Sequence, residues 1–398
     1  MLEAALSAGI ASAGGTALLA GVVPTPAVSR LVIADGCEGG VVISASHNPF
    51  ADNGIKLMGP DGKKLPDEVE LEIERRMGEA VGLGLDASPT RSVGGEAVGV
   101  IEELPGAGPR YVDDLLAAVR ADLSGMRVLL DCAHGAAYRV APLAFTATGA
   151  RVETAFAEPD GVNINAGCGS THVGPLSSLV AQGDFDLGLA FDGDADRVLA
   201  VDATGRPVDG DQILTILASR LSELGQLAND TVVVTSMSNL GFHRAMRERG
   251  IHVEVTDVGD RYVLERMLQT GAVLGGEQSG HVIYLPAGAT GDGLQTGLLL
   301  CDALRASGKG LDQAASAMAR FPQVLVNVPV QKKDRLKEAA VVWSAVEEEE
   351  AALGDDGRIV LRPSGTESLI RVMVEAPTEE RCREVAGRLA EVVERCLV

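Results

Sequence analysis

Three aspartates recur at every second residue in the segment Asp192-Gly-Asp194-Ala-Asp196-Arg197, directly after an apolar run. Carboxylates at i, i+2 and i+4 of an extended segment lie on one side of it, so they can converge on one hard cation. An EF-hand loop does not fit, because Arg197 stands where that loop needs glycine and Ala203 where it needs glutamate. Three carboxylates leave coordination positions open, which suits Mg²⁺ that must also bind a phosphate oxygen. The alternative is an acidic surface turn.

A serine next to a histidine lies in the segment SASHNP, residues 44–49, and Lys56 follows in NGIK. Ser46 on such a loop could act as a nucleophile. A serine hydrolase is a poor fit, since the G-x-S-x-G elbow is missing and no evident Asp–His pair completes a triad. A phosphate carrier fits better, because phosphoryl transfer needs an in-line oxygen, a metal and positioned cations. A simple Asx-type turn explains the segment equally well.

A cationic loop near the C-terminus, RPSGTE at residues 362–367, offers donors to a phosphate. Arg362 supplies a bidentate fork, while Ser364, Gly365 and Thr366 supply hydroxyl and backbone N–H groups. No G-x-x-x-x-G-K-[ST] occurs, so this is not a nucleotide P-loop. Turn chemistry explains Pro, Ser and Gly equally well, but the second cation, Arg371, favours phosphate binding.

A fourth polar loop, GEQSGH at residues 276–281, places Glu277 and Ser279 between glycines. A carboxylate and a hydroxyl on such a loop suit sugar hydroxyls or an amine, although a polar turn explains them as well. His281 alone is more typical of a structural histidine. The pair Asp260-Arg261 could add a further cation, with the same reservation.

The composition excludes several classes of protein. The 34 basic and 56 acidic residues give a net charge of −22, and no cluster of Lys and Arg could release counterions from DNA or RNA. The uncharged stretch 4–29 is rich in Ala, Gly and Pro, so it predicts a helix, a buried strand and a loop rather than a membrane span. Six scattered cysteines without zinc spacing indicate a reduced, cytoplasmic protein.

Short apolar runs alternate with amphipathic stretches, which is typical of an α/β protein. Strands at 41–43 and 186–191 lead into the serine loop and the acidic loop. Further strands are expected at 127–131, 231–235, 252–256 and 272–275, helices at 66–77 and 110–121, and a glycine-rich linker at 82–99. The stretch after residue 320 predicts a small α+β unit, with strands at 323–329, 358–361 and 369–375 and helices at 335–353 and 378–396.

The four loops, in this order, resemble those of the α-D-phosphohexomutase superfamily. SASHNP with NGIK, FDGDADR with VDGDQI, GEQSGH, and RPSGTE with LIRVMVE all match, and the resemblance covers essentially the whole chain. The Gln in GEQSGH and the segment LIRVMVE favour the glucosamine branch over the mannose and glucose branches. The resemblance implies three α/β/α domains with mixed sheets (residues 1–105, 106–205 and 206–320) and a smaller α+β domain (residues 321–398) around a central cleft.

The resemblance also implies roles for individual residues. Ser46 would be a phosphoserine and, with Asp192, Asp194 and Asp196, would hold one Mg²⁺. Arg197 and Lys56 would stabilise the transferring charge, with Lys56 or His47 assisting proton transfer. The phosphosugar would be held by Asp260, Arg261, Glu277, Ser279, His281, Arg362, Ser364, Gly365, Thr366 and Arg371. The implied reaction interconverts glucosamine 6-phosphate and glucosamine 1-phosphate through a 1,6-bisphosphate that also serves as activator, with neither nucleic acid nor membrane as partner.

Members of the superfamily normally begin several dozen residues earlier, with a first strand and glycine- and arginine-containing loops, whereas Met1 falls in the first helix after that region. We therefore expect either a mis-assigned start or a shortened chain whose first sheet has an unpaired edge. Ser368 also stands where proline usually follows RPSGTE. The alternatives to the glucosamine reaction are a phosphomannomutase or phosphoglucomutase, a metal-dependent phosphatase with Asp192 as nucleophile, and an inactive relative that still binds phosphosugars.

Overall fold

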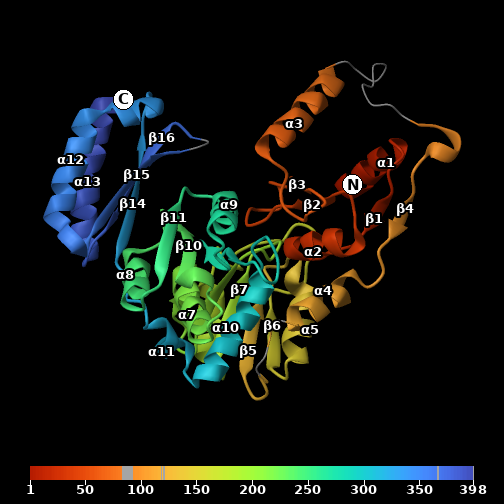
Figure 1. Cartoon of the computed structure of the whole chain (residues 1–398), viewed down its shortest axis with the longest axis horizontal. Coiled ribbons are helices and arrows are strands. Elements are labelled where there is room, and N and C mark those ends of the chain that lie inside the picture. The colour runs from red at the N-terminus through yellow and green to blue at the C-terminus, as the bar shows by residue number, and fades with distance from the viewer. Residues whose placement is uncertain (83–92, 118, 120–121, 365–366, 398) are drawn as a thin grey trace.

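The computed structural model describes residues 1–82, 93–117, 119, 122–364 and 367–397 (Figure 1). Four successive units of helices and strands follow one another along the chain, and the α/β class that the alternation of apolar runs predicted is confirmed. Most of the expected glycine-rich linker, residues 83–92, lies outside the described residues. None of the helices in the described ranges combines the length and the apolar character that crossing a membrane requires.

The N-terminal unit contains two small sheets. Strand β1 (Ala17–Leu19) pairs in parallel with β4 (Ile101–Glu103), and β2 (Gly40–Ser44) pairs antiparallel with β3 (Gly54–Met58). Its helices are α1 (Leu2–Ser12), α2 (Thr25–Asp35) and α3 (Asp67–Gly82). The expected loop after β1 is wrong in part, because Pro24 and Pro26 introduce helix α2. Proline is tolerated in the first turn of a helix, where its missing N–H would have no partner.

The second unit is a five-stranded sheet of order β6-β5-β7-β8-β9. The parallel strands are β6 (Arg151–Ala155), β5 (Arg127–Asp131) and β7 (Leu187–Phe191). Strand β8 (Val198–Asp202) pairs antiparallel with both β7 and β9 (Pro207–Val208). Strand β7, LGLAF, is buried at every residue, as expected for a central strand covered on both faces. Its helices are α4 (Ala107–Leu116), α5 (Ala137–Ala147) and α6 (Gly174–Gln182).

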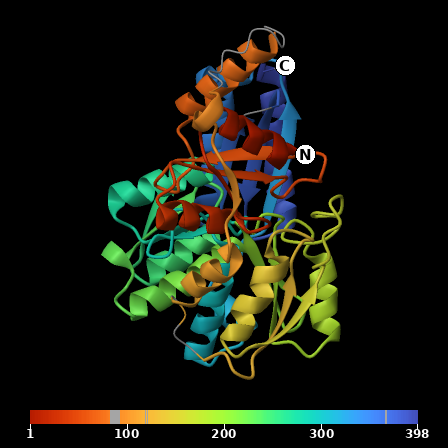
Figure 2. The same cartoon turned by 90° about the vertical axis from the view of Figure 1, so that its right-hand side faces the viewer.

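The third unit repeats this plan with the sheet order β11-β10-β12-β13. Its strands are β10 (Thr231–Thr235), β11 (His252–Thr256), β12 (Leu274–Gly276) and β13 (Val282–Tyr284), and its helices are α7 (Gly210–Glu223), α8 (Leu240–Glu248), α9 (Asp260–Thr270), α10 (Gly293–Ser307) and α11 (Leu311–Ala315). One continuous apolar core runs through the second and third units. The two therefore form a single body, and Figure 2 shows them side by side.

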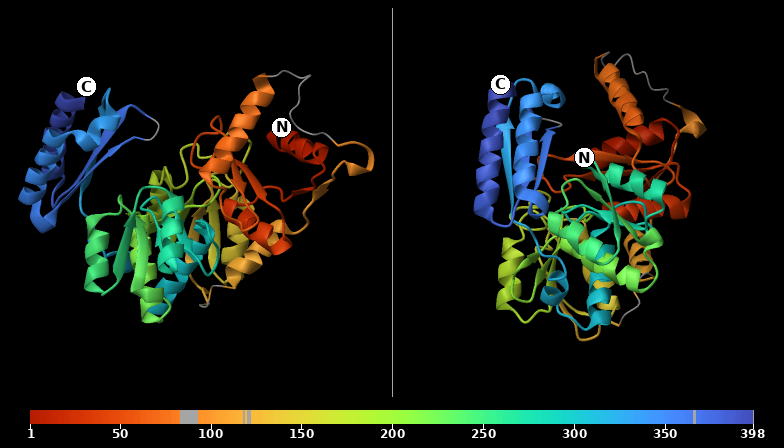
Figure 3. Two further views of the ribbon diagram at one scale, coloured as in Figure 1. Left: turned by 45° about the horizontal axis from the view of Figure 1, so that its top comes forward. Right: turned by 60° about the vertical axis from the view of Figure 1, so that its left-hand side comes forward.

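The C-terminal unit has a core of its own. Strands β14 (Gln323–Pro329), β16 (Leu369–Glu375) and β15 (Arg358–Pro363) form an antiparallel sheet in that order, covered by α12 (Ala340–Leu353) and α13 (Glu379–Leu397). Figure 3 shows this unit, in blue, standing beside the central body at the end opposite to the N-terminal unit. The expected strands and helices of this region are confirmed, with α12 beginning five residues later than predicted.

Candidate active site

The three aspartates after β7 form a buried cluster. Asp192, Asp194 and Asp196 are 1%, 2% and 4% exposed, and one carboxylate oxygen from each lies within 4.8 Å of the others. The loop that carries them begins at the carboxyl end of a parallel strand, where α/β sheets commonly place their ligands. The convergence predicted from the i, i+2, i+4 spacing is therefore present in the structure.

The cluster fits a divalent cation. Asp192 Oδ2, Asp194 Oδ1 and Asp196 Oδ1 are buried and have no hydrogen-bond partner among the described residues. Burial and the two neighbouring carboxylates raise the pKa of Asp192 well above its usual range. Buried acceptors without hydrogen-bond donors are costly unless cations compensate them, and within the described part of the chain only Asp196 Oδ1 of the three has protein cations near it, in longer ionic contacts. These oxygen ligands suit Mg²⁺, which favours carboxylates and water.

The serine loop lies against the metal loop. Ser46 follows β2 by two residues, adopts a φ of 53°, and has its backbone N–H bonded to the Ser44 hydroxyl at 2.9 Å. A Cβ on Gly193 would stand 2.5 Å from the Ser46 carbonyl oxygen, so only glycine permits this approach. Ser46 Oγ lies 3.5 Å from His47 Nδ1. Burial, and then the Arg197 charge, lower the pKa of His47, which favours the neutral imidazole.

Cations from two units surround the carboxylates. Lys56 Nζ, on β3, lies 2.6 Å from Asp194 Oδ2 and 3.1 Å from Asp196 Oδ2. Burial alone would lower the pKa of Lys56, but Asp196 and Asp194 outweigh it and raise the pKa above its usual range. Arg197 Nε lies 3.7 Å from Asp196 Oδ1. Lys56 is thus held in its charged form and is suited to stabilising charge rather than to accepting a proton.

Two further side chains support this cluster, and sequence reasoning missed both. Thr25 Oγ1, at the start of α2, donates to Asp194 Oδ2 at 2.6 Å. Asn165 Nδ2, from the loop between β6 and α6, donates to the carbonyls of Ser46 and Asn48 at 2.8 Å each. Neither residue stands in one of the four loops. In the sequence, Thr25 is only a threonine after a proline and Asn165 only an asparagine in a loop, and many residues share such settings.

The expected sugar loop, between β12 and β13, is preorganised by its own contacts. Glu277 Oε1 accepts from the backbone N–H of Gly259 at 3.2 Å, and Ser279 Oγ lies 3.5 Å from Glu277 Oε2. His281, which the resemblance implied as a substrate contact, is 3% exposed and lies between Asp196 and Asp260, at 3.6 and 3.8 Å. Its physical role in this structure is to connect the metal loop with α9.

Asp260 and Arg261 connect units rather than standing free. Asp260 pairs with Lys64 of the N-terminal unit, and Arg261 pairs with Asp67 of α3 and with Glu265. Burial alone would raise the pKa of Asp260, but His281 and Lys64 outweigh it, so the pKa lies below its usual value. In this arrangement both residues join the N-terminal unit to the third unit.

The C-terminal loop presents two neighbouring guanidinium groups. Arg362 and Arg371 are directly paired in the register of β15 and β16, and the Nε of each is buried without a hydrogen-bond partner among the described residues. Burial, and then the charge of Arg371, lower the pKa of Arg362, whereas the charge of Glu277 acts in the opposite direction. Like charges facing each other across strands are unfavourable without an anion. The pair therefore suits a phosphate.

The remaining members of that loop are partly described. Ser364 is 3% exposed, and its hydroxyl accepts from the Glu367 N–H at 3.2 Å. Lys333 Nζ, which sequence reasoning did not single out, donates to the carbonyl of Ser364 at 3.0 Å. The expected phosphate donors Gly365 and Thr366 lie outside the described residues.

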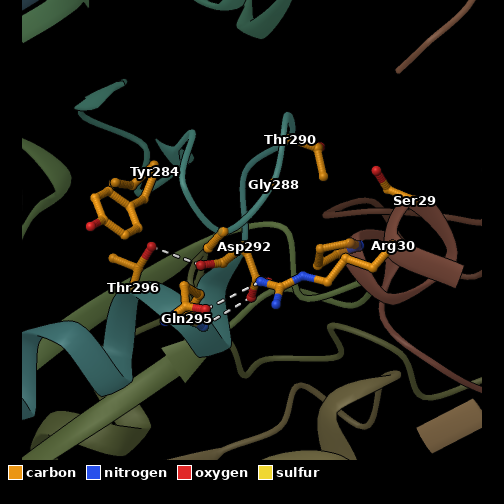
Figure 4. A pocket seen from close by; sticks show the side chains of 11 residues that line it. Ser29, Arg30, Tyr284, Gly288, Thr290, Asp292, Gln295 and Thr296 are labelled. Carbon is orange, nitrogen blue, oxygen red and sulfur yellow. Dashed lines mark hydrogen bonds and ion pairs between the residues drawn. The ribbon is translucent and has the colours of Figure 1, made fainter. Parts of the chain in front are cut away.

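A small enclosed pocket lies where the N-terminal and third units meet (Figure 4). Arg30 of α2 donates to Asp292 at 2.6 Å, and Tyr111 of α4 donates to the other oxygen at 2.8 Å. Asp292 also caps α10 by accepting from the backbone N–H of Gln295. At about 10 Å³ the cavity has room for roughly one water molecule. It is thus a structural junction that holds α2 and, through Thr25, supports the metal loop.

Comparisons with known proteins agree with this geometry. Four family models match: phosphoglucomutase/phosphomannomutase alpha/beta/alpha domains I (residues 1–81), II (109–205) and III (209–321), and the C-terminal domain (325–392). The chain is 55% identical over 393 residues to the phosphoglucosamine mutase of Saccharopolyspora erythraea, covering 99% of this chain and 86% of that protein. It is 53% identical over 396 residues to the phosphoglucosamine mutase of a Nocardioides species, covering 100% and 86%.

Solved structures share the fold. A phosphoglucomutase/phosphomannomutase family protein from Burkholderia thailandensis is 21% identical with a TM-score of 0.81, covering 99% of this chain and 86% of that one. The N-acetylphosphoglucosamine mutase of Aspergillus fumigatus, solved with GlcNAc-6P and magnesium, is 19% identical with a TM-score of 0.72, covering 100% and 94%.

Proposed function

The chain belongs to the phosphohexomutase superfamily of phosphoglucomutases and phosphomannomutases, and we propose that it interconverts glucosamine 6-phosphate and glucosamine 1-phosphate. The single observation that carries the proposal is the contact between two loops from different units. The serine loop is pressed against Gly193 of the metal loop, and Lys56 binds the carboxylates of that same loop. A serine, a metal-ligand set and a fixed cation are the components that phosphoryl transfer requires.

In the proposed reaction Ser46 carries a phosphoryl group on Oγ. The bond between Oγ and phosphorus breaks as a sugar hydroxyl oxygen forms a new bond to phosphorus, and the hydroxyl proton leaves. His47, whose lowered pKa favours the neutral form, is the better proton acceptor, since Lys56 is held charged. Lys56 and Arg197 stabilise the charge on the transferring group. Mg²⁺ bound by Asp192, Asp194 and Asp196 supplies charge neutralisation for the phosphoryl oxygens.

The other end of the substrate is held by the C-terminal unit in this proposal. Arg362 and Arg371 bind the non-reacting phosphate, and Glu277 and Ser279 bind the sugar. The resulting 1,6-bisphosphate reverses its orientation and returns the other phosphate to Ser46, so a trace of bisphosphate serves as activator. The product glucosamine 1-phosphate leads towards UDP-N-acetylglucosamine. A cytoplasmic location stays a prediction that follows from this role.

The test is ³¹P NMR of the purified chain with Mg²⁺, glucosamine 6-phosphate and a trace of hexose 1,6-bisphosphate. We expect the signal of glucosamine 1-phosphate to appear. Ser46→Ala should abolish it, whereas Ser44→Ala, two residues away, should retain the phosphorylation site. Turnover that survives Ser46→Ala would instead support a metal-dependent phosphatase or another nucleophile. Glucose 1-phosphate and mannose 1-phosphate are run in parallel, and a rate on either that equals or exceeds the glucosamine rate would refute the sugar assignment.

A further inference from the structure

Asn165, in the loop between β6 and α6, holds the serine loop through two hydrogen bonds. Asn165 is 6% exposed, and both carbonyls that its Nδ2 binds belong to the serine loop, one on each side of His47. An amide nitrogen carries two hydrogens, so the two acceptors use its full donor capacity. Because both acceptors are carbonyl oxygens, the orientation of the amide follows from chemistry: the reversed orientation would place oxygen against oxygen.

Backbone hydrogen bonds hold Asn165 and its loop in place. The backbone N–H of Asn165 donates to the Ala133 carbonyl at 2.9 Å, and the residue adopts a φ of 57°, which asparagine tolerates better than most residues. Further along the same loop, the N–H of Ser170 donates to the Phe191 carbonyl at 2.8 Å. Phe191 is the last residue of β7, directly before the metal loop. The loop that carries Asn165 and the loop that carries the metal ligands are therefore both anchored at the carboxyl end of β7.

The two loops meet in van der Waals contact as well. A Cβ on Gly193 would stand 2.5 Å from the Ser46 carbonyl oxygen and 2.6 Å from Ile164, the neighbour of Asn165. The Ser46 carbonyl thus lies against the metal loop while it accepts a hydrogen bond from Asn165. A displacement of this carbonyl would move Ser46 Oγ relative to the three aspartates.

We propose that Asn165 is a positioning residue that fixes Ser46 in register with the metal loop. This inference rests on the proposed function for its kinetic consequence, although the positioning itself is a property of the free protein. The oxygen of the amide, Oδ1, is buried without a hydrogen-bond partner among the described residues, which is unfavourable for folding. The N–H groups of the amide are therefore the part that positions Ser46, and a side chain of the same shape without these donors should not hold Ser46 in place.

The test compares Asn165→Asp, Asn165→Ala and the matched control Asn163→Ala. Asn163 lies in the same loop, but its amide bonds the Glu158 carbonyl and the Asp160 N–H, away from Ser46. We expect both Asn165 variants to lower kcat at least tenfold with KM changed less than threefold, and Asn163→Ala to leave both parameters near wild type. Asn165→Asp should be the more damaging, because a carboxylate would face two carbonyl oxygens.

Hydrogen exchange provides a readout that does not need turnover. In the free protein the N–H of Ser46 bonds Ser44 Oγ, and that of Asn48 bonds the Ala45 carbonyl at 2.9 Å, so both start protected. We expect residues 44–50 to exchange at least fivefold faster in the Asn165 variants, with exchange in the α7 and α10 helices unchanged. If wild type shows no turnover, the proposed function fails, and exchange alone then decides the positioning role.

Three results would overturn the inference. One is unchanged kcat in both Asn165 variants of an active enzyme. Another is unchanged exchange of residues 44–50. The third is a general loss of structure, with both Asn165 variants exchanging faster throughout the second unit than Asn163→Ala, because that would show a structural role of the loop rather than placement of Ser46.

Discussion

Substitution of Arg371 by alanine should weaken binding of the phosphosugar without lowering the stability of the protein. Arg371 faces Arg362 in the register of β15 and β16, and its contact with Glu367, at 3.4 Å, is at the surface. Facing like charges cost up to about 1 kcal/mol, and an exposed ion pair contributes roughly 0–1 kcal/mol. These terms nearly cancel, so we expect an unchanged melting temperature or a rise of a few degrees.

The effect on binding has the opposite sign and is larger. A hydrogen bond to a charged group contributes about 1.5–3 kcal/mol, and about 1.4 kcal/mol corresponds to a factor of ten. Loss of the Arg371 contact with phosphate should therefore raise KM, or the dissociation constant of glucosamine 6-phosphate, roughly 10- to 150-fold. Arg371→Lys should recover only part of this, since an ammonium group lacks the planar fork.

Arg358→Ala is the matched control, because it removes an arginine from the same two strands that has a different partner. Arg358 Nε lies 3.0 Å from the fully buried carboxylate of Glu375. Breaking a buried ion pair costs about 3–5 kcal/mol, so this variant should have a lower melting temperature. Its dissociation constant for phosphosugar should stay within about twofold of the wild-type value. Calorimetry with and without ligand measures both quantities. Loss of stability in Arg371→Ala together with unchanged affinity would refute the phosphate assignment.

Four further outcomes are expected. Thr25→Val, which keeps the shape but removes the hydrogen bond to Asp194, should weaken Mg²⁺ binding about tenfold in titration calorimetry, and unchanged affinity would contradict the role of Thr25. Arg30→Ala should lower the free energy of unfolding in urea by about 3 kcal/mol. The substitution leaves the Asp292 carboxylate, shown in Figure 4, buried with neutral donors only. A change below about 1 kcal/mol would contradict this. Burial and Asp209 raise the pKa of Asp211 to about 7. Protonation of Asp211 therefore stabilises the folded state fully below about pH 4, and this contribution is lost as the pH rises towards 7. Asp211→Asn should gain stability relative to wild type between about pH 5 and 8, and parallel pH profiles of the two proteins would contradict this. Chelation of divalent cations should abolish turnover and still permit phosphosugar binding measured by calorimetry, and lost binding would show that the C-terminal cations do not suffice.

The acidic cluster was predictable because its geometry is local. Aspartates at i, i+2 and i+4 after an apolar run face one side whatever the rest of the chain does, and β7 ends where the run predicted. The serine loop was predictable as a strand-exit segment for the same reason. That these loops lie in contact followed from the resemblance alone, since the spacing along the chain does not bring residue 46 to residue 193.

The supporting residues were not predictable, because their roles depend on distant partners. Thr25 and Asp194 are 169 residues apart, and Asn165 and Ser46 are 119 apart. A threonine after proline, or an asparagine in a loop, usually satisfies a local turn or cap. The resemblance implied a phosphosugar contact for His281, whereas its loop alone was more typical of a structural histidine. In the structure it is buried between two carboxylates.

In the proposed reaction, the local charges of the site allow an acidic chain to bind an anionic substrate. Around the metal loop, the carboxylates of Asp194 and Asp196 face Lys56, and Arg197 also lies near Asp196. In the proposed reaction, a divalent cation at this end compensates the buried carboxylates and attracts the reacting phosphate. The C-terminal end is different, because Arg362 and Arg371 are cationic without metal. In the proposed reaction the non-reacting phosphate is thus bound whether or not Mg²⁺ is present, and the reacting end becomes competent only with it. Because the two kinds of cation lie on separate units, the substrate of the proposed reaction can reverse its ends without changing what either unit recognises.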